Sequence, residues 1–176
     1  MIDGPAYSLG NANGSTVTLA SITAGTSHTV IFSEWVRGKN QQPGNGLWQT
    51  YSTSMSVPSV YTALTTIVSD CQSSTTVFLS GSTPWARKGE EWLDHNCATG
   101  GCNSHVMTPD KKACFFIGDG VHTIYTLVGA SSNHSGGVNC ALLDGSVRFI
   151  KDSISQQTWW AISTKAGGEI ISSDSL

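Results

Sequence analysis

The chain has 176 residues and a formal charge of −3, with only 12% charged residues against 25 serines, 19 threonines and 19 glycines. This composition argues against coiled coils and helical bundles and favours a β-rich protein with long loops. The sequence has no basic cluster beyond Lys111 and Lys112, so we expect no nucleic-acid partner. No apolar run approaches the roughly 20 residues of a membrane span, so we expect no membrane contact.

Local patterns predict the elements in chain order. Residues 1–14 are expected to form a loop, and the sequence Met1 to Pro5 does not have the pattern of a signal peptide. From Pro58 to Ser73, apolar residues recur every three or four positions and predict a helix with one apolar stripe. Strands are expected at 16–19, 29–36, 75–79, 114–117, 138–143, 146–150 and 169–171, with a second helix at 153–164.

The clearest local signal is Asp144-Gly145 between two apolar runs. This dipeptide predicts a two-residue hairpin with a type I′ turn, in which both central residues have positive φ. Together, these elements predict an α+β fold with an antiparallel sheet, short helices and long loops, as a single domain over residues 1–176.

The five cysteines point to disulfides and to a location outside the cytoplasm. We expect Cys97 and Cys102 to close a short flexible loop, and Cys71 to pair with Cys114. Cys140 lies in an apolar run and is then left as a buried free thiol. Zinc is not favoured, because the sequence has no pair of CxxC knuckles.

Several segments resemble one known family. His134, nine further residues and then Asp144-Gly145 match the H-x9-DG signature of prepilin-type, type II secretion pseudopilin-like proteins of the DUF1559 type, abundant in planctomycetes. The segments 132–139 (SNHSGGVN) and 144–149 (DGSVRF) look like the family's sequence around this signature. Upstream, 22–31 (ITAGTSHTVI) is similar to another family segment, and Glu34 stands where that family carries a glutamate.

The resemblance implies a pilin-like head domain outside the cytoplasm, periplasmic, cell-surface or secreted, with a structural or secretion-associated role. Its partners would be other pseudopilin or secretion-system subunits. The family's cleaved leader and long apolar helix do not appear in this sequence, so we interpret it as the head domain alone. Ala24 and His28 replace the Asp and Asn of the family pattern, which weakens any inherited role for those two positions.

For the signature residues we expect structural roles, with His134 ordering a loop through the backbone of Gly136 and Gly137, and Asp144 and Gly145 shaping the turn. An extended strand of nine residues separates His134 from Asp144 by roughly 30 Å, so the two do not meet. No cofactor is expected apart from calcium, which related pseudopilins bind. Its candidate oxygen ligands here are Asp144, Asp152 and Asp119.

Two other classes of function stay open at this point. A small serine-type hydrolase of esters or polyesters would use His134 with Ser131, Ser132 or Ser135, or use Ser27 with His28, and Asp144 is a further candidate. Tryptophans 35, 48, 85 and 92 would then offer a platform for a polymer, although a packing role for them is the simpler interpretation. A pure binding module is the third class, for which the sequence names no ligand.

Overall fold

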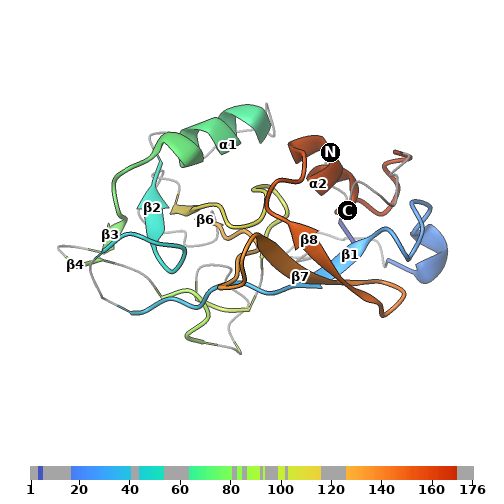
Figure 1. The fold of residues 1–176 in the computed structure, drawn as a ribbon, viewed down its shortest axis with the longest axis horizontal. Coiled ribbons are helices and arrows are strands. Elements are labelled where there is room, and N and C mark those ends of the chain that lie inside the picture. The colour runs from blue at the N-terminus through green and yellow to red at the C-terminus, as the bar shows by residue number, and fades with distance from the viewer. Residues whose placement is uncertain are drawn as a thin grey trace.

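The computed structural model describes residues 4–5, 17–40, 44–53, 64–80, 83–84, 87–91, 93, 99–101, 103–115 and 126–169. Within these, the chain forms an α+β fold with small sheets, two short α-helices and long connecting loops, as expected (Figure 1). The elements are η1 (Leu19–Ser21), β1 (Val30–Ser33), β2 (Thr50–Ser52), α1 (Leu64–Ser73), β3 (Leu79–Ser80), β4 (Thr83–Pro84), β5 (Ala113–Phe115), β6 (Thr126–Leu127), β7 (Gly137–Leu142), β8 (Val147–Lys151) and α2 (Gln156–Ala161).

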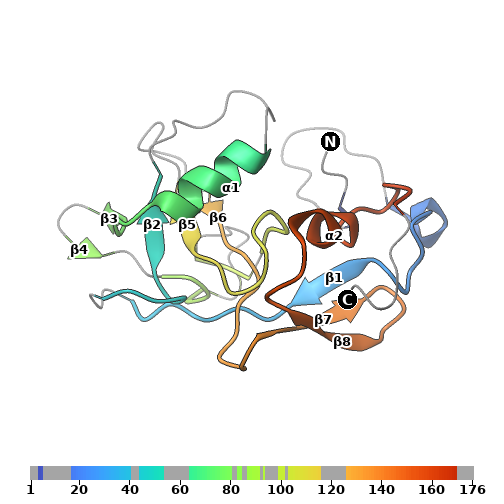
Figure 2. The same ribbon diagram turned by 45° about the horizontal axis from the view of Figure 1, so that its top comes forward.

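The larger sheet is antiparallel and has the strand order β1-β7-β8. β7 and β8 pair in register from Gly137 opposite Lys151 to Ala141 opposite Val147. α2 covers one face of this sheet (Figure 2). The helix begins at Gln156 because the Ser155 hydroxyl caps it, accepting the Thr158 N–H at 3.0 Å.

The second sheet has the order β2-β5-β6, and α1 packs on it. β5 runs parallel to β2 and antiparallel to β6, so this small sheet is mixed, whereas the sequence suggested only antiparallel pairing. The buried residues of α1 are Ile67, Val68 and Cys71, which belong to the predicted apolar stripe. The start of that predicted helix, residues 58–63, lies outside the described residues.

Each sheet has its own hydrophobic cluster. In the β1-β7-β8 cluster, Trp159 packs with strand residues such as Val138 and Ile150, all three fully buried. The other cluster contains Tyr51, the buried face of α1 and Met107. Trp160 packs against both clusters, and its indole N–H donates to the Val106 carbonyl at 2.9 Å. Trp160 therefore connects the two cores.

Two predicted strands differ from the structure. The segment 16–19 does not form a strand over its described residues, and a 3-10 turn at Leu19–Ser21 follows Thr18. There the Ser21 hydroxyl donates to the Thr18 carbonyl and accepts the Thr18 N–H, so a local polar side chain replaces ladder bonds. The strand predicted at 75–79 is reduced to a single bridge between Val77 and Tyr51, followed by β3.

None of the helices in the described parts of the chain is long and apolar enough to cross a lipid bilayer.

Candidate functional site

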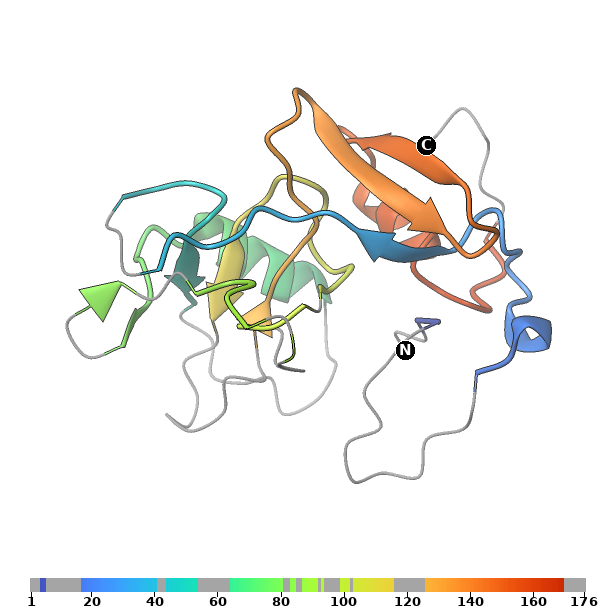
Figure 3. The ribbon, with the colours of Figure 1, turned by 90° about the horizontal axis from the view of Figure 1, so that it is seen from below.

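The predicted signature residues His134 and Asp144 lie before and after β7 in the chain, so this strand separates them. Figure 3 shows β7, in orange, between β1 and β8. At the far end, the Gly145 N–H donates to the Leu142 carbonyl at 3.0 Å, and the Leu142 N–H donates to the Ser146 carbonyl at 2.8 Å. Gly145 has φ +86°, whereas Asp144 does not have positive φ. This is a three-residue loop with glycine in the left-handed position, so the predicted type I′ turn is wrong.

The longer loop has a physical reason, because its backbone is bonded to the chain that precedes β1. The Leu143 N–H donates to the Thr29 carbonyl at 2.9 Å, and the Asp144 N–H donates to the Thr26 carbonyl at 3.1 Å. The Asp144 carboxylate accepts the Ser146 hydroxyl at 2.7 Å and the Ser146 N–H at 2.9 Å, and these bonds lower the pKa of the carboxyl. Asp144 therefore shapes the turn, in the structural role expected of it.

At the near end, Ser132 organises the loop that carries His134. The Ser132 hydroxyl donates to the Gly137 carbonyl and accepts the His134 N–H, both at 2.8 Å. The Ser132 N–H donates to the Asp110 carboxylate at 2.8 Å. Neighbouring Ser131 is also buried and bonded to the backbone, accepting the Val36 N–H at 2.9 Å.

The His134 ring does not make the predicted bond to Gly136 or Gly137. It is exposed, and its Nε2 lies 3.6 Å from Oε2 of Glu34, the residue that follows β1. The other carboxylate oxygen of Glu34 accepts the Asn139 N–H at 2.6 Å and the Asn139 side-chain amide at 3.1 Å. Glu34, His134 and Asn139 thus form one polar cluster on the side of the sheet opposite α2.

Among the described residues, this cluster does not place a serine hydroxyl where the His134 ring could activate it as a nucleophile. His134 has a carboxylate beside it, but the Ser132 hydroxyl is buried and held by two backbone groups. Ser135 is exposed in the same loop, and no bond from it to the ring is present. A general base must lie within hydrogen-bond reach of the proton it takes, and that contact is missing.

The second candidate pair, Ser27 and His28, does make contact. The Ser27 hydroxyl lies 3.1 Å from Nδ1 of the His28 ring. Within the described parts of the chain, no carboxylate lies within ion-pair distance of that ring. Among the described residues, the pair therefore has no third group to orient the base, and it lies in the loop before β1.

The two described candidate calcium ligands, Asp144 and Asp152, lie at opposite ends of β8. Asp144 is occupied with Ser146, and Asp119 lies outside the described residues. Asp152 lies near Asp110; burial raises the pKa of the Asp110 carboxyl, and the charges of Asp152 and Glu34 raise it further. Nevertheless, no three His, Cys, Asp or Glu side chains in the described parts gather as a metal site would require.

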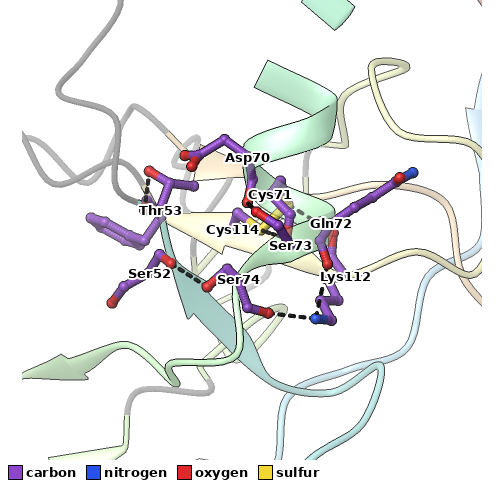
Figure 4. Close-up of a disulfide and its surroundings, with 10 residues drawn as sticks. Ser52, Thr53, Asp70, Cys71, Gln72, Ser73, Ser74, Lys112 and Cys114 are labelled. Atoms are coloured by element: carbon purple, nitrogen blue, oxygen red, sulfur yellow. Dashed lines mark hydrogen bonds between the residues drawn. A yellow bond between two sulfur atoms is a disulfide. The ribbon is translucent and has the colours of Figure 1, made fainter. Parts of the chain in front are cut away.

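The predicted disulfide between Cys71 and Cys114 is confirmed, and it joins α1 to β5 (Figure 4). Beside it, the Lys112 ammonium donates to the Gln72 carbonyl at 3.2 Å and to the Ser74 carbonyl. Cys140 is a buried free thiol, as expected. The other predicted bridge, between Cys97 and Cys102, lies outside the described residues.

Two surface hollows in the described part of the chain include residues of α1 in their lining. One, of about 350 Å³, is lined by Tyr51, Gln72 and the lysines 111 and 112 among others. The second, of about 450 Å³, is lined by serines and threonines together with Asp70. Of the four tryptophans of the predicted platform, Trp35 and Trp48 are half-buried, and Trp85 and Trp92 lie outside the described residues, so the platform stays a prediction.

The family model "Protein of unknown function (DUF1559)" matches residues 6–157, which is most of the chain. The chain belongs to this family. Searches of curated proteins and of solved structures found no significant match. The geometry of Glu34, Ser132, His134 and Asn139 is therefore known here from this DUF1559 chain and not from a related solved structure.

Sequence reasoning did not assign roles to Asp110, Asn139 or Lys88. Asp110 has φ +60°, and its carboxylate accepts the Ser132 backbone N–H. The only sequence feature that marks this position is an aspartate between a proline and two lysines. Lys88 is buried and donates to the Leu47 carbonyl, and burial lowers its pKa to about 8. A lysine in a loop gives no sequence signal of such burial.

Proposed function

We propose that this DUF1559 chain is the head domain of a pilin-like or pseudopilin-like protein, with a structural or secretion-associated role outside the cytoplasm. It acts by contact with other proteins, such as pseudopilin or secretion-system subunits. The observation that carries the proposal is the face of the β1-β7-β8 sheet that α2 does not cover.

Part of that face is apolar and exposed. Phe32 is 69% exposed and Val147 is 66% exposed, and both lie opposite Ala141 across the sheet. Phe149, on the same face of β8, is 43% exposed. Large apolar side chains gathered on one face of a sheet are typical of surfaces that contact other proteins.

The signature residues support this face from one end. The Glu34 carboxylate bonds Asn139 of β7, which lies opposite Phe149 of β8. Gly137 allows β8 to approach closely, because a Cβ at this position would lie 2.1 Å from the Ile150 carbonyl oxygen. The serines and glycines of the motif thus have packing and turn roles that need no chemistry on a substrate.

The Cys71–Cys114 disulfide supports a location outside the cytoplasm, because disulfides persist in oxidising compartments. Among the described residues, the alternative of a serine hydrolase has only the contact between Ser27 and His28 in its favour, and no described carboxylate lies beside that pair. Its serine candidates beside His134 are either held by the backbone or without a bond to the ring.

The test is made in the producing organism. Protease accessibility and fractionation should place the chain outside the cytoplasm, and its deletion should reduce secreted protein or surface assembly. Complementation with Phe32→Ser plus Val147→Ser should fail, while Leu19→Ser, an equally exposed apolar site outside the sheet, should restore the phenotype. The proposal is contradicted if the double variant restores the phenotype, or if fractionation places the chain in the cytoplasm. Hydrolysis of a short-chain chromogenic ester that a serine-reactive inhibitor abolishes would instead support the hydrolase.

A further inference from the structure

The open edge of β8 offers a second inference about the same face, and it rests on the proposed function. Backbone groups of an antiparallel strand point alternately to its two neighbours. The Ser146 carbonyl accepts the N–H of Leu142 at the end of β7, and the Asp152 N–H donates to the carbonyl of Gly136, which directly precedes β7. By this alternation, the backbone N–H and C=O groups of Arg148 and Ile150 also point to β7. The N–H and C=O groups of Val147 and Phe149 therefore point to the free edge.

The opposite edge of the sheet is covered. The Val30 N–H of β1 donates to the Ile162 carbonyl at 2.8 Å, and nearby the Ala24 N–H donates to the Lys165 carbonyl at 3.0 Å. Within the described residues, β8 is therefore the edge of this sheet that is available to another strand. A sheet with one available edge closes as a pair of copies, whereas two available edges would permit a chain of copies.

We propose that a second copy of this chain occupies that edge, with β8 paired antiparallel to β8 of the other copy about a two-fold axis at Phe149. This register places Phe149 against Phe149 of the second copy, which is a favourable cross-strand aromatic pair. Lys151 comes opposite Val147, and Arg148 comes opposite Ile150, so no like charges face each other directly. The charge of Arg148 is also offset within its own copy, because it helps to lower the pKa of the Asp144 carboxyl.

The consequence is a continuous six-stranded sheet that carries one apolar face across both copies. Phe32, Val147 and Phe149 of each copy lie on that face, and α2 of each copy lies on the other. Pairing would remove the exposed β8 edge, which otherwise invites unspecific association.

The test compares two phenylalanines on the same face, using the purified chain. Phe149→Cys should give a covalent dimer with a short bismaleimide, because directly paired residues lie about 5.5 Å apart at Cα. Phe32→Cys is more exposed but lies two strands from the axis, and it should give no more dimer than the unmodified chain.

Sedimentation over a range of concentrations gives the second measurement. Phe149→Lys places like charges opposite each other at the axis and should weaken dimerisation by about tenfold or more. Phe32→Lys makes the same change off the axis and should leave the dimer within about threefold. The inference is wrong if the unmodified chain stays monomeric at its highest soluble concentration, or if both cysteine variants cross-link equally. A monomer that is still required for secretion would overturn only the dimer, and a dimer without a secretion or assembly phenotype would overturn only the proposed function.

Discussion

Glu34 joins the end of β1 to β7 through hydrogen bonds with Asn139. Its carboxylate accepts the Asn139 backbone N–H at 2.6 Å, and the Glu34 N–H donates in return to the Asn139 carbonyl at 3.3 Å. The side chain therefore continues the strand pairing beyond Ser33, where β1 ends. A glutamate outside the H-x9-DG signature is thus the partner of residues inside it.

Glu34→Ala should lower the free energy of unfolding by about 1.5–3 kcal/mol, because it leaves a half-buried N–H without its charged acceptor. Glu34→Gln keeps an oxygen at the same place and should cost about half as much. Urea unfolding of both variants measures the difference. Equal losses in the two variants would mean that the Asn139 bond is not the source of the effect.

His134→Ala should cost no more than about 1 kcal/mol, because the side chain is 59% exposed and its contact with Glu34, at 3.6 Å, is long. The backbone bond from His134 to Ser132 survives this substitution. Ser132→Ala is the informative comparison, since it removes two bonds of a buried hydroxyl and should cost about 1–3 kcal/mol. A larger loss in His134→Ala than in Ser132→Ala would reverse the roles assigned to these residues.

Two glycines of the hairpin should respond differently to alanine. Gly145→Ala meets open space but keeps φ +86°, which costs about 1 kcal/mol for a side-chain residue. Gly137→Ala places its Cβ against the Ile150 backbone, so β8 must move or separate, and the loss should be the larger of the two. Thermal melts of both variants decide this. Similar melting temperatures would show that β8 adjusts freely at Gly137.

The sequence predicts the elements of this fold best where one local pattern is enough. The stripe of α1 and the alternation of β7 and β8 identify these elements, because each follows the period of one regular structure. The turn between β7 and β8 is predicted at the right place but with the wrong type. Its length depends on bonds from Leu143 and Asp144 to Thr29 and Thr26, more than 100 positions earlier in the chain.

The candidate site shows the same division. Ser132, His134 and Asn139 are close in sequence, so a motif can place them together in one loop and strand. Glu34 and Asp110 reach this loop only through the sheet and its connections, and no local pattern connects them to it. Neither the open edge of β8 nor the covered edge of β1 is visible without the order of strands.

The cysteines should differ sharply in reactivity. Burial raises the pKa of the Cys140 thiol to about 12, and the nearby Glu34 charge adds to this, so the nucleophilic thiolate is scarce at neutral pH. Iodoacetamide should leave Cys140 unmodified in the folded chain and modify it in urea, as peptide mapping can measure. Rapid labelling of Cys140 without denaturant would contradict the buried position.

Replacing Cys71 and Cys114 by alanine should lower the free energy of unfolding by about 3–4 kcal/mol through the loss of their bridge.

His105 should make the fold sensitive to mild acid. Its Nε2 atom is buried without a partner, and its ring meets the buried Trp159 edge to face at 3.8 Å between centroids. Burial lowers the pKa of His105 to about 4. An unfolded chain binds this proton below about pH 6.5, whereas the folded chain does not bind it until about pH 4. Stability is therefore complete above pH 6.5 and falls as the pH falls through this window.

The expected loss from this one residue is about 3 kcal/mol by pH 4. His105→Phe keeps an aromatic ring against Trp159 but cannot take a proton, so its free energy of unfolding should fall less steeply between pH 6.5 and 4. His134→Ala is the matched control, because it removes an exposed imidazole and should keep the steeper dependence of the unmodified chain. Urea unfolding at several pH values gives the three slopes. Parallel curves for the unmodified chain and His105→Phe would show that the His105 ring is accessible to protons in the folded state.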